Sequence, residues 1–476
     1  MLRYVIGQIL KMEAALMGLP LLVSLYYRDD GLLPLLAVML SLGILGYILS
    51  AFKPKNQTIY AREGFVIVAL AWLLMSVFGA LPFVISGCIP NFIDALFETV
   101  SGFTTTGSTL LTDVEALPKG LLFWRSFTHW IGGMGVLVFA LAILPGGSAQ
   151  SMHIMRAEVP GPTVGKLVAK TQITARILYG IYMFLTVLEV VLLRITGLDW
   201  FNSLVTSFAT AGTGGFSVLN SGIAGYNNVW TEVIITVFML VFSINFNLFY
   251  MLLMRQFSAV VKNTEVKVFF AIYIIAALLI TGNILSMYNS FAEAFRYAGF
   301  TVASIISSTG FGTADYTLWP GFSQTILILL MFCGACAGST GGGLKVARVM
   351  ILCKTAVSEV RHQLNPRLVS TVKLEGQLVD SEQIRTQGSF FVWYMLILLV
   401  STLIVSIDNF GFDVSFSAAV TCVNNIGPGL GKIGPYGNFS EFSELSKLVL
   451  TADMLIGRLE IFTLLVALMP RTWKKA

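Results

Sequence analysis

Four stretches of this 476-residue chain share one pattern, an apolar segment rich in Thr, Ser and Asn that ends at a glycine. They read FETVSGFTTTG (97–107), NSLVTSFATAG (202–212), FTVASIISSTG (300–310) and SAAVTCVNNIG (417–427). Each stretch follows one long apolar segment and precedes another. Similar units at roughly regular intervals are typical of repeat architectures. The sequence therefore predicts four units, each with a span, a half-helix leading into a polar strand, and a second span.

The composition identifies a helical integral membrane protein. Hydrophobic residues make up 56% of the chain and charged residues 12%, about half the charged share of a soluble domain. Runs such as 64–91 and 233–254 carry no charge. A helix needs about 20 apolar residues to cross a bilayer, and these runs lack the alternation of a barrel strand. A soluble multi-domain protein, a disordered chain and a disulfide scaffold are excluded.

The predicted fold is an all-α polytopic membrane protein, with four repeats around a pseudo-four-fold pore and two extra N-terminal helices. Ten spans are expected near 4–27, 32–52, 63–87, 121–145, 175–197, 229–254, 266–286, 320–352, 388–407 and 446–469. The eighth is interrupted by glycines. The half-helices begin near Asp94, Asp199, Ala294 and Asp413. The domain boundaries are 1–60 for the N-terminal pair, then 61–172, 173–264, 265–387 and 388–476 for the four repeats.

Charge predicts the orientation. With ten crossings and both termini cytoplasmic, most of the 30 Lys and Arg residues fall on the inner side, as the positive-inside rule requires. The longest hydrophilic stretch, 358–387, is then a cytoplasmic linker or docking surface. The opposite face is acidic, which concentrates cations near a pore mouth.

Four polar strands that meet around an axis can form a cation filter. Backbone carbonyls replace the water shell of an ion in such filters, and glycine permits the conformations that align them. The C-terminal ends of the half-helices carry partial negative charge. No acidic residue lies in the strands, which favours a monovalent cation over a hard divalent one. The predicted filter residues are Thr105, Thr106, Gly107, Thr210, Ala211, Gly212, Ser308, Thr309, Gly310, Asn425, Ile426 and Gly427.

A second motif, CGACAGSTGGGLK (333–345), interrupts the eighth span below the third strand. Consecutive glycines do not hold an ordinary helix well, so we expect a flexible constriction there; a plain kink is the alternative. Arg458 lies within the last span, where an arginine is costly and faces the interior. It is either a positive barrier below the filter or a salt-bridge partner of Glu460, Asp453 or Glu232. The predicted gate residues are Gly338, Ser339, Thr340, Gly341, Gly342, Gly343, Lys345 and Arg458.

Other chemistries find little support in the sequence. The five cysteines and three histidines show no convincing ligand spacing, and no nucleophile has a base in evident reach. We therefore expect no enzyme activity, no organic cofactor and no nucleic-acid partner. The glycine motif differs from a phosphate loop because Leu344, and not Lys, follows its glycines.

Taken together, the four strands, WRSFTHWIGGMG (124–135), AGSTGGGLK (337–345) and GRLE (457–460) resemble the TrkH/TrkG type of the Trk/Ktr/HKT cation transporter superfamily. The resemblance covers almost the whole chain, and the two extra N-terminal spans are similar to TrkH and not to KtrB. The fourth strand, NNIGP (424–428), departs most from the family's Thr-Thr-Gly pattern.

The resemblance implies potassium (K⁺) uptake across a bacterial plasma membrane by a homodimer with one pore in each protomer. It also implies a cytosolic ring of TrkA-type subunits that bind nucleotides and control opening. The family's filter glycines correspond to Gly107, Gly212, Gly310 and Gly427, and its gating loop and pore arginine to 334–345 and Arg458. The alternative is a secondary transporter that couples potassium to protons or sodium, for which Glu98, Glu189, Glu232 and Asp453 are candidate carboxylates.

Overall fold

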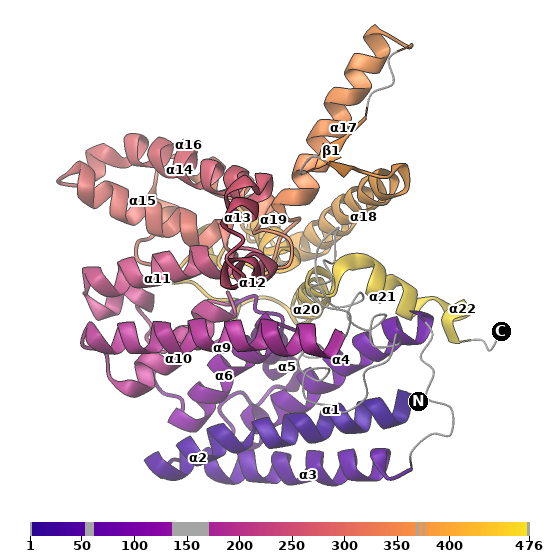
Figure 1. The fold of residues 1–476 in the computed structure, drawn as a ribbon. Coiled ribbons are helices and arrows are strands. Elements are labelled where there is room, and N and C mark those ends of the chain that lie inside the picture. The colour runs from indigo at the N-terminus through magenta and orange to yellow at the C-terminus, as the bar shows by residue number, and fades with distance from the viewer. Residues whose placement is uncertain (1, 53–60, 136–170, 368–370, 375–376, 474–476) are drawn as a thin grey trace.

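The computed structural model describes residues 2–52, 61–135, 171–367, 371–374 and 377–473. Nearly all of its secondary structure is helical, which confirms the predicted class (Figure 1). The sheet in the described part of the chain is one short antiparallel pair, β1 (Lys373–Leu374) with β2 (Gln377–Leu378).

The N-terminal segment is a helical pair at one edge of the molecule. It consists of α1 (Leu2–Leu16), α2 (Gly18–Tyr27) and α3 (Leu32–Ser50). Together α1 and α2 make one apolar span, and α3 makes the next. The left-handed conformation of Arg28 ends the first span and begins the turn into the second. Figure 1 shows α1 and α3 side by side.

Four units follow. Unit 1 contains α4 (Ala61–Ile85), α5 (Phe92–Phe103) and α6 (Lys119–Gly133). Unit 2 contains α9 (Thr171–Ile195), α10 (Trp200–Ala211), α11 (Val229–Phe242), α12 (Phe246–Leu253) and α13 (Phe257–Lys262). Unit 3 contains α14 (Thr264–Ile284), α15 (Phe291–Ile306), α16 (Gly321–Cys333) and α17 (Val346–Leu364). Unit 4 contains α18 (Ser381–Val405), α19 (Phe412–Val423), α20 (Glu444–Arg458), α21 (Glu460–Leu468) and α22 (Pro470–Trp473).

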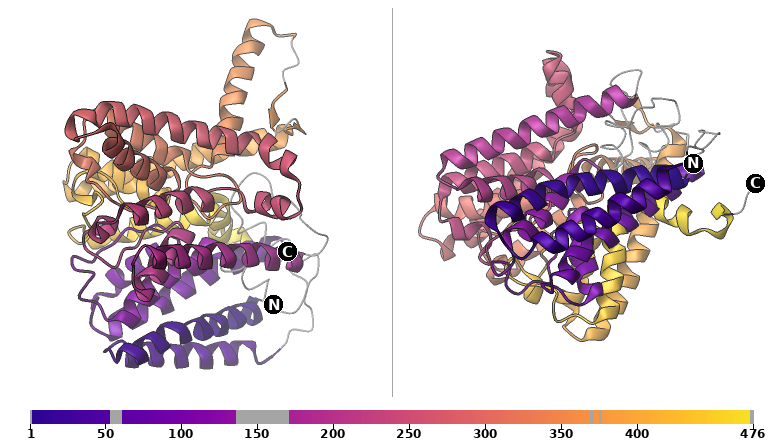
Figure 2. Two further views of the ribbon diagram at one scale, coloured as in Figure 1. Left: turned by 60° about the vertical axis from the view of Figure 1, so that its left-hand side comes forward. Right: turned by 90° about the horizontal axis from the view of Figure 1, so that it is seen from below.

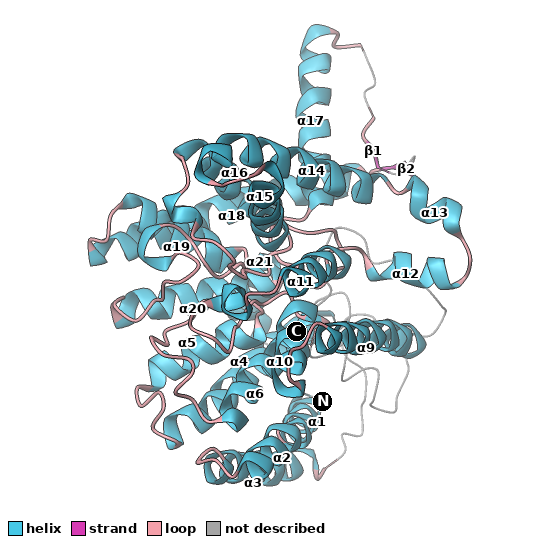
Figure 3. Cartoon of the chain, turned by 90° about the vertical axis from the view of Figure 1, so that its left-hand side faces the viewer, coloured by secondary structure: helices cyan, strands magenta, loops and turns pink. Residues whose placement is uncertain are grey.

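Short 3₁₀ turns join several of these helices: Gly222–Tyr226, Leu285–Met287, Tyr316–Leu318, Ser406–Asp408 and Gly431–Ile433. Figures 2 and 3 show most helices packed in one bundle, while α17 projects away from it.

The four predicted half-helices are confirmed as α5, α10, α15 and α19. Three begin at a side-chain cap, because Asn91, Asp199 and Ser290 each accept a hydrogen bond from a backbone N–H of the first turn. The C-terminal parts of all four are almost completely buried. Each passes directly into a polar strand, so the four helix ends converge on the interior of the bundle.

The ten predicted spans are seen to different extents in the described chain. Six helical segments of the described chain are long and apolar enough to cross a membrane: Leu2–Tyr27, Leu32–Ser50, Glu63–Ile85, Ile173–Ile195, Thr264–Met287 and Ser381–Asp408. They match six of the predicted spans. The other four are the second spans of the units, and the structure interrupts them or describes them only in part.

The interruptions have local causes. The span at 229–254 is bent by 92° between α11 and α12, where Asn245 caps the new helix. The span at 446–469 is interrupted at Glu460, whose φ is 54°. The predicted break in 320–352 is confirmed and covers 334–345. For 121–145, α6 ends at Gly133, and 136–145 lie outside the described residues.

Candidate functional site

The four half-helices enter their strands through the same series of backbone conformations. The second residue after each helix is left-handed, with φ between 53° and 58°, at Thr105, Thr213, Ser308 and Asn425. Two residues later a glycine has φ between 76° and 98°, at Gly107, Gly215, Gly310 and Gly427. The residue between them donates its N–H to a half-helix carbonyl, as Thr106 does to Ser101 at 2.9 Å. The four units are therefore equivalent in backbone geometry.

These strands close into a ring, which we call the carbonyl ring: residues 105–107, 213–215, 308–310 and 425–427. Each strand ends at a glycine that faces a carbonyl oxygen of the adjacent strand; these four, Gly107, Gly215, Gly310 and Gly427, are called the ring glycines. A Cβ atom built on Gly107 would lie 2.0 Å from the carbonyl oxygen of Gly214, and one on Gly215 would lie 1.9 Å from that of Thr309. A Cβ on Gly310 would lie 2.1 Å from the carbonyl oxygen of Ile426, and one on Gly427 would lie 2.7 Å from that of Thr106. The fourth strand thus returns to the first. Both the positive φ and the close approach require glycine.

The structure corrects the predicted register of the second strand by three residues. Thr210 and Ala211 belong to the last turn of α10, and Gly212 is its cap, with φ −71°. Thr213, Gly214 and Gly215 have the ring conformation instead. The Thr-x-Gly pattern occurs twice in TAGTGG (210–215), and the first occurrence falls within the helix. The other nine predicted filter residues lie in the carbonyl ring.

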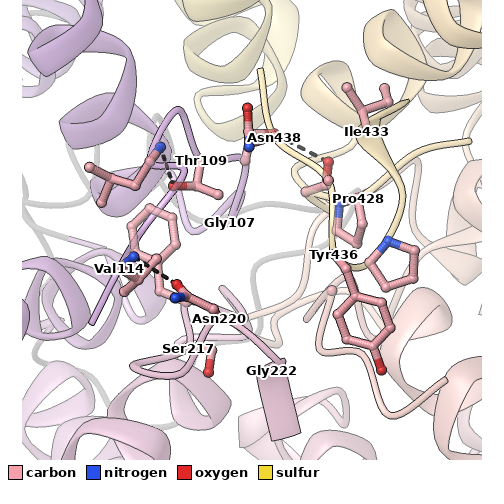
Figure 4. Close-up of a pocket in the computed structure, with 18 of the residues that line it drawn as sticks. Gly107, Thr109, Val114, Ser217, Asn220, Gly222, Pro428, Ile433, Tyr436 and Asn438 are labelled. Carbon is pink, nitrogen blue, oxygen red and sulfur yellow. Dashed lines mark hydrogen bonds between the residues drawn. The ribbon is translucent and has the colours of Figure 1, made fainter. Parts of the chain in front are cut away.

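The ring opens into a cavity of about 160 Å³, which all four ring glycines line (Figure 4). Its rim is polar and includes Thr109, Ser217, Asn220 and Asn438. Asn220 joins the loops that follow the strands of units 1 and 2, since it accepts from the N–H of Val114 and donates to Asp113, both at 2.8 Å. The hydrogen bond from Asn220 holds the pKa of Asp113 below its ordinary value. The ring is therefore adjoined by a cavity with a polar rim.

The electrostatics of the ring favour a cation. The C-terminal ends of four half-helices lead into it, each with partial negative charge. The nearby acid Glu98 is compensated, because it accepts from Arg125 at 2.7 Å and from the N–H of Leu110 at 2.9 Å. Arg125 also donates to the carbonyl of Ser217. The pair thus holds the ends of strands 1 and 2, and the ring itself presents neutral carbonyls.

The glycine motif forms a loop, residues 334–345, directly against the ring. A Cβ on Gly342 would lie 2.3 Å from the carbonyl oxygen of Asn424, and one on Gly341 2.7 Å from that of Ser307. The N–H of Gly342 donates to the hydroxyl of Ser308. The loop therefore lies in contact with strands 3 and 4 on the side of their helix caps.

The break between α11 and α12 holds the other side of the loop. Thr340 donates its hydroxyl to the carbonyl of Phe242 at 3.1 Å, and the N–H of Phe246 donates to Gly338 at 3.0 Å. The hydroxyl of Ser339 donates within the loop, to the carbonyl of Cys336. Positive φ values at Gly338, Gly343 and Lys345 shape the turns. All predicted gate residues of this motif thus belong to one loop.

Arg458 joins the loop to unit 1. Its guanidinium donates to the carbonyl oxygens of Thr340 at 2.9 Å and Gly133 at 2.6 Å, and also to that of Gly132. Lys345 is buried and donates to the carbonyl of Gly341. Two basic side chains, Arg458 and Lys345, therefore donate hydrogen bonds to main-chain carbonyls next to the ring.

The three acids proposed from sequence as partners of Arg458 have other partners. Glu460 forms an ion pair with Arg348, Glu232 with Arg296, and Asp453 accepts from Ser401 at 2.8 Å. Arg458 itself bonds the glycine loop through the carbonyl of Thr340.

Several residues of the site were not predicted. Gly215 was missed because of the register ambiguity, and Gly132 and Gly133 because they lie in an apolar run. Glu265, on α14, accepts from the N–H groups of Ala337 at 2.7 Å and Ala347 at 3.2 Å and so ties both ends of the loop. In the sequence, Glu265 could be recognised only as an acidic residue at the start of a predicted span. His129 had no recognisable partner in the sequence.

Comparison with known proteins agrees with this geometry. The family model described as TrkH, cation transport protein, matches residues 36–475. The chain is 35% identical to the Trk system potassium uptake protein TrkH of Escherichia coli K12, over 99% of this chain and 98% of that protein. It is 30% identical to TrkG of the same strain, over 96% and 94%.

The fold also matches a solved structure. The crystal structure of the potassium transporter TrkH from Vibrio parahaemolyticus has a TM-score of 0.88 and 32% identity, with 99% of each chain covered. These relatives are named as transporters and not as enzymes, which agrees with the prediction made for this chain. The resemblance seen in the sequence is therefore confirmed, and this multi-pass membrane protein belongs to the TrkH family of cation transport proteins.

Proposed function

We propose that this chain takes up potassium across the bacterial plasma membrane, with the carbonyl ring as its selectivity filter. One observation carries the proposal: four equivalent strands close into a ring in which the glycine that ends each strand faces a neighbouring carbonyl oxygen. Carbonyl rings of this kind replace the hydration shell of a potassium ion. The relatives, which are named as potassium uptake proteins and a potassium transporter, support the same ion.

The loop 334–345 and Arg458 are proposed as the gate. The loop touches strands 3 and 4, and the guanidinium bonds the loop to the end of α6. The adjoining cavity, lined by Gly342, Asn425 and Arg458 among others, holds about 20 Å³, close to the room that one water needs. An ion that leaves the ring on this side therefore meets a closed passage with a fixed positive charge.

Regulation and assembly belong to the same proposal. The relatives are components of a system, which supports further subunits, and the family resemblance favours a TrkA-type nucleotide-binding ring in the cytosol. The same resemblance favours a homodimer with both termini cytoplasmic. Mass measurement of the detergent-solubilised protein with a TrkA-type protein checks both assemblies.

Cation flux into liposomes that contain this chain alone tests the ion. Potassium, rubidium, sodium and lithium gradients are compared at clamped pH, and the regulatory ring is added in a second series. Saturable potassium and rubidium flux with little sodium flux is expected. Equal sodium flux would contradict a potassium filter, and absence of flux in both series would contradict transport.

Coupled transport is the second candidate, and buried carboxyls favour it. Glu98 and Glu232 are in ion pairs, which leaves Glu189 and Asp453 of the acids proposed from sequence. Both oxygens of Glu189 and one of Asp453 are buried without a hydrogen bond among the described residues. Carboxyls within the membrane can serve as proton relays. Potassium flux that is unaffected by imposed proton and sodium gradients, in the wild type and in Glu189→Gln, excludes this alternative.

A further inference from the structure

His129 lies at the junction of units 1 and 2, completely buried on α6. Its Nδ1 atom is 2.7 Å from the carbonyl oxygen of Gly102, in the last turn of α5. The backbone N–H of Phe216 donates to its Nε2 atom at 3.3 Å. The imidazole also packs on the ring of Phe216, with 4.1 Å between the centroids. One side chain thus bonds a half-helix of one unit and the strand of the next.

These two contacts define the protonation of the imidazole. A carbonyl oxygen only accepts, so Nδ1 must carry a hydrogen and donate to Gly102. A backbone N–H only donates, so Nε2 must be unprotonated and accept from Phe216. The neutral Nδ1–H tautomer is the one form that satisfies both partners. A second proton on Nε2 would put two donors face to face.

The imidazole also limits where the second strand can lie. A Cβ atom on Gly214 would be 2.3 Å from Nδ1 of His129, and the carbonyl oxygen of His129 approaches Gly212 equally closely. Gly214 supplies the ring carbonyl that faces Gly107. Phe216 directly follows the ring glycine Gly215. A shift of the imidazole therefore moves a ring carbonyl, although His129 does not belong to the ring.

We propose that His129, as the neutral Nδ1–H tautomer, is a positioning residue for ion selectivity, which it controls by fixing the second strand against the first half-helix. The proposal rests on the carbonyl ring being the filter. The proposal can be distinguished from a merely structural role by two measurements. The ratio of potassium to sodium flux depends on where the ring carbonyls lie. The amount of folded protein depends on burial of the side chain.

Three substitutions separate the two hydrogen bonds from the shape of the ring. His129→Asn keeps a donor near the Nδ1 position, His129→Gln keeps an acceptor near the Nε2 position, and His129→Phe keeps the ring without either. Ser126→Ala is the matched control, because Ser126 is equally buried on the same helix and its hydroxyl has no hydrogen bond among the described residues. Each variant is reconstituted, and its potassium-to-sodium flux ratio and potassium KM are measured.

We expect His129→Phe to lower the flux ratio by about tenfold or more, the equivalent of 1.4 kcal/mol. The Asn and Gln variants should fall between it and the wild type, and Ser126→Ala should match the wild type. A wild-type ratio and KM in His129→Phe would overturn the inference. If the wild type itself does not discriminate between the ions, the proposed filter fails instead.

A spectroscopic measurement keeps the inference testable if His129→Phe does not fold. The chain has three histidines, so His153→Gln/His362→Gln leaves His129 as the single imidazole. Nitrogen-15 NMR of this protein in bilayers at neutral pH should show Nδ1 protonated and Nε2 unprotonated. The Nε2–H tautomer or the doubly protonated form would overturn the inference.

Discussion

Alanine at each of the four ring glycines should damage selectivity to a degree that the ring geometry predicts. All four glycines have positive φ, so every substitution carries the same conformational cost of about 1–2 kcal/mol. The steric cost differs. The new Cβ would meet a carbonyl oxygen at 1.9–2.1 Å in Gly107→Ala, Gly215→Ala and Gly310→Ala, but at 2.7 Å in Gly427→Ala.

The difference in distance sets the expected magnitude. Real Cβ contacts are essentially never shorter than 3.0 Å, so a ring carbonyl must move by about 1 Å in the first three variants and by a few tenths of an ångström in Gly427→Ala. Misplacement of about 1 Å can cost a site about 100-fold in function. We expect the potassium-to-sodium flux ratio to fall by about tenfold or more in the first three variants and clearly less in Gly427→Ala.

The assay is flux of each cation into liposomes, normalised to the folded protein recovered by gel filtration. All four variants should lose thermal stability, because they share the conformational cost, and Gly427→Ala should lose least and keep the highest flux ratio, because its steric cost is smallest. Equal losses of selectivity in all four, or a greater loss in Gly427→Ala, would refute the steric argument. Unchanged selectivity in Gly215→Ala would refute the corrected register of the second strand.

Three further predictions test the supports of the site. Glu98→Ala and Arg125→Ala should each lower the free energy of unfolding by about 3–5 kcal/mol, since each leaves a buried charge unpaired. In denaturant titration the double variant should lose less stability than the sum of the two single variants, and strict additivity would contradict the ion pair. Glu265→Ala removes two hydrogen bonds from the loop and should raise basal potassium flux about tenfold without the regulatory subunits. Flux equal to that of the wild type would contradict the role of Glu265 in holding the loop. Deletion of Gly343 should also raise basal conductance, whereas current that still depends fully on the regulatory subunits would contradict the gate.

The repeat and the half-helices could be predicted because local features encode them. A helix start at Asp199 and a change from apolar to Thr- and Ser-rich sequence are visible without tertiary information. The closure of the four strands is not local. It depends on contacts between distant parts of the chain, such as the approach of the Thr106 carbonyl to Gly427. The hydroxyl of Ser108 also donates to the carbonyl of Gly427, which lies 319 residues away.

The errors have equally specific causes. The second strand was placed three residues early because Gly212 and Gly215 both fit the Thr-x-Gly pattern, and only the φ values distinguish a helix cap from a ring position. The breaks at Asn245 and Glu460 were missed because isolated polar residues hardly change the mean hydropathy of a long apolar run. The role of His129 could not be predicted, since its partners are backbone groups that carry no side-chain signature.

The ends of α6 at Gly133 and of α11 at Phe242 explain why the loop and Arg458 can lie where they do. A helix that ends within a membrane leaves carbonyls without intrahelical donors, and such groups are costly away from water. In unit 1 the carbonyls of Gly132 and Gly133 accept from Arg458 of unit 4. In unit 2 the carbonyl of Phe242 accepts from Thr340 of the unit 3 loop. The ends of α6 and α11 are thus both bonded by donors from the proposed gate. Movement of the loop and Arg458 away from the pore would expose these carbonyls, and water or a passing cation would have to replace the lost donors. In the proposed mechanism, opening of the gate and hydration of the passage are therefore one event.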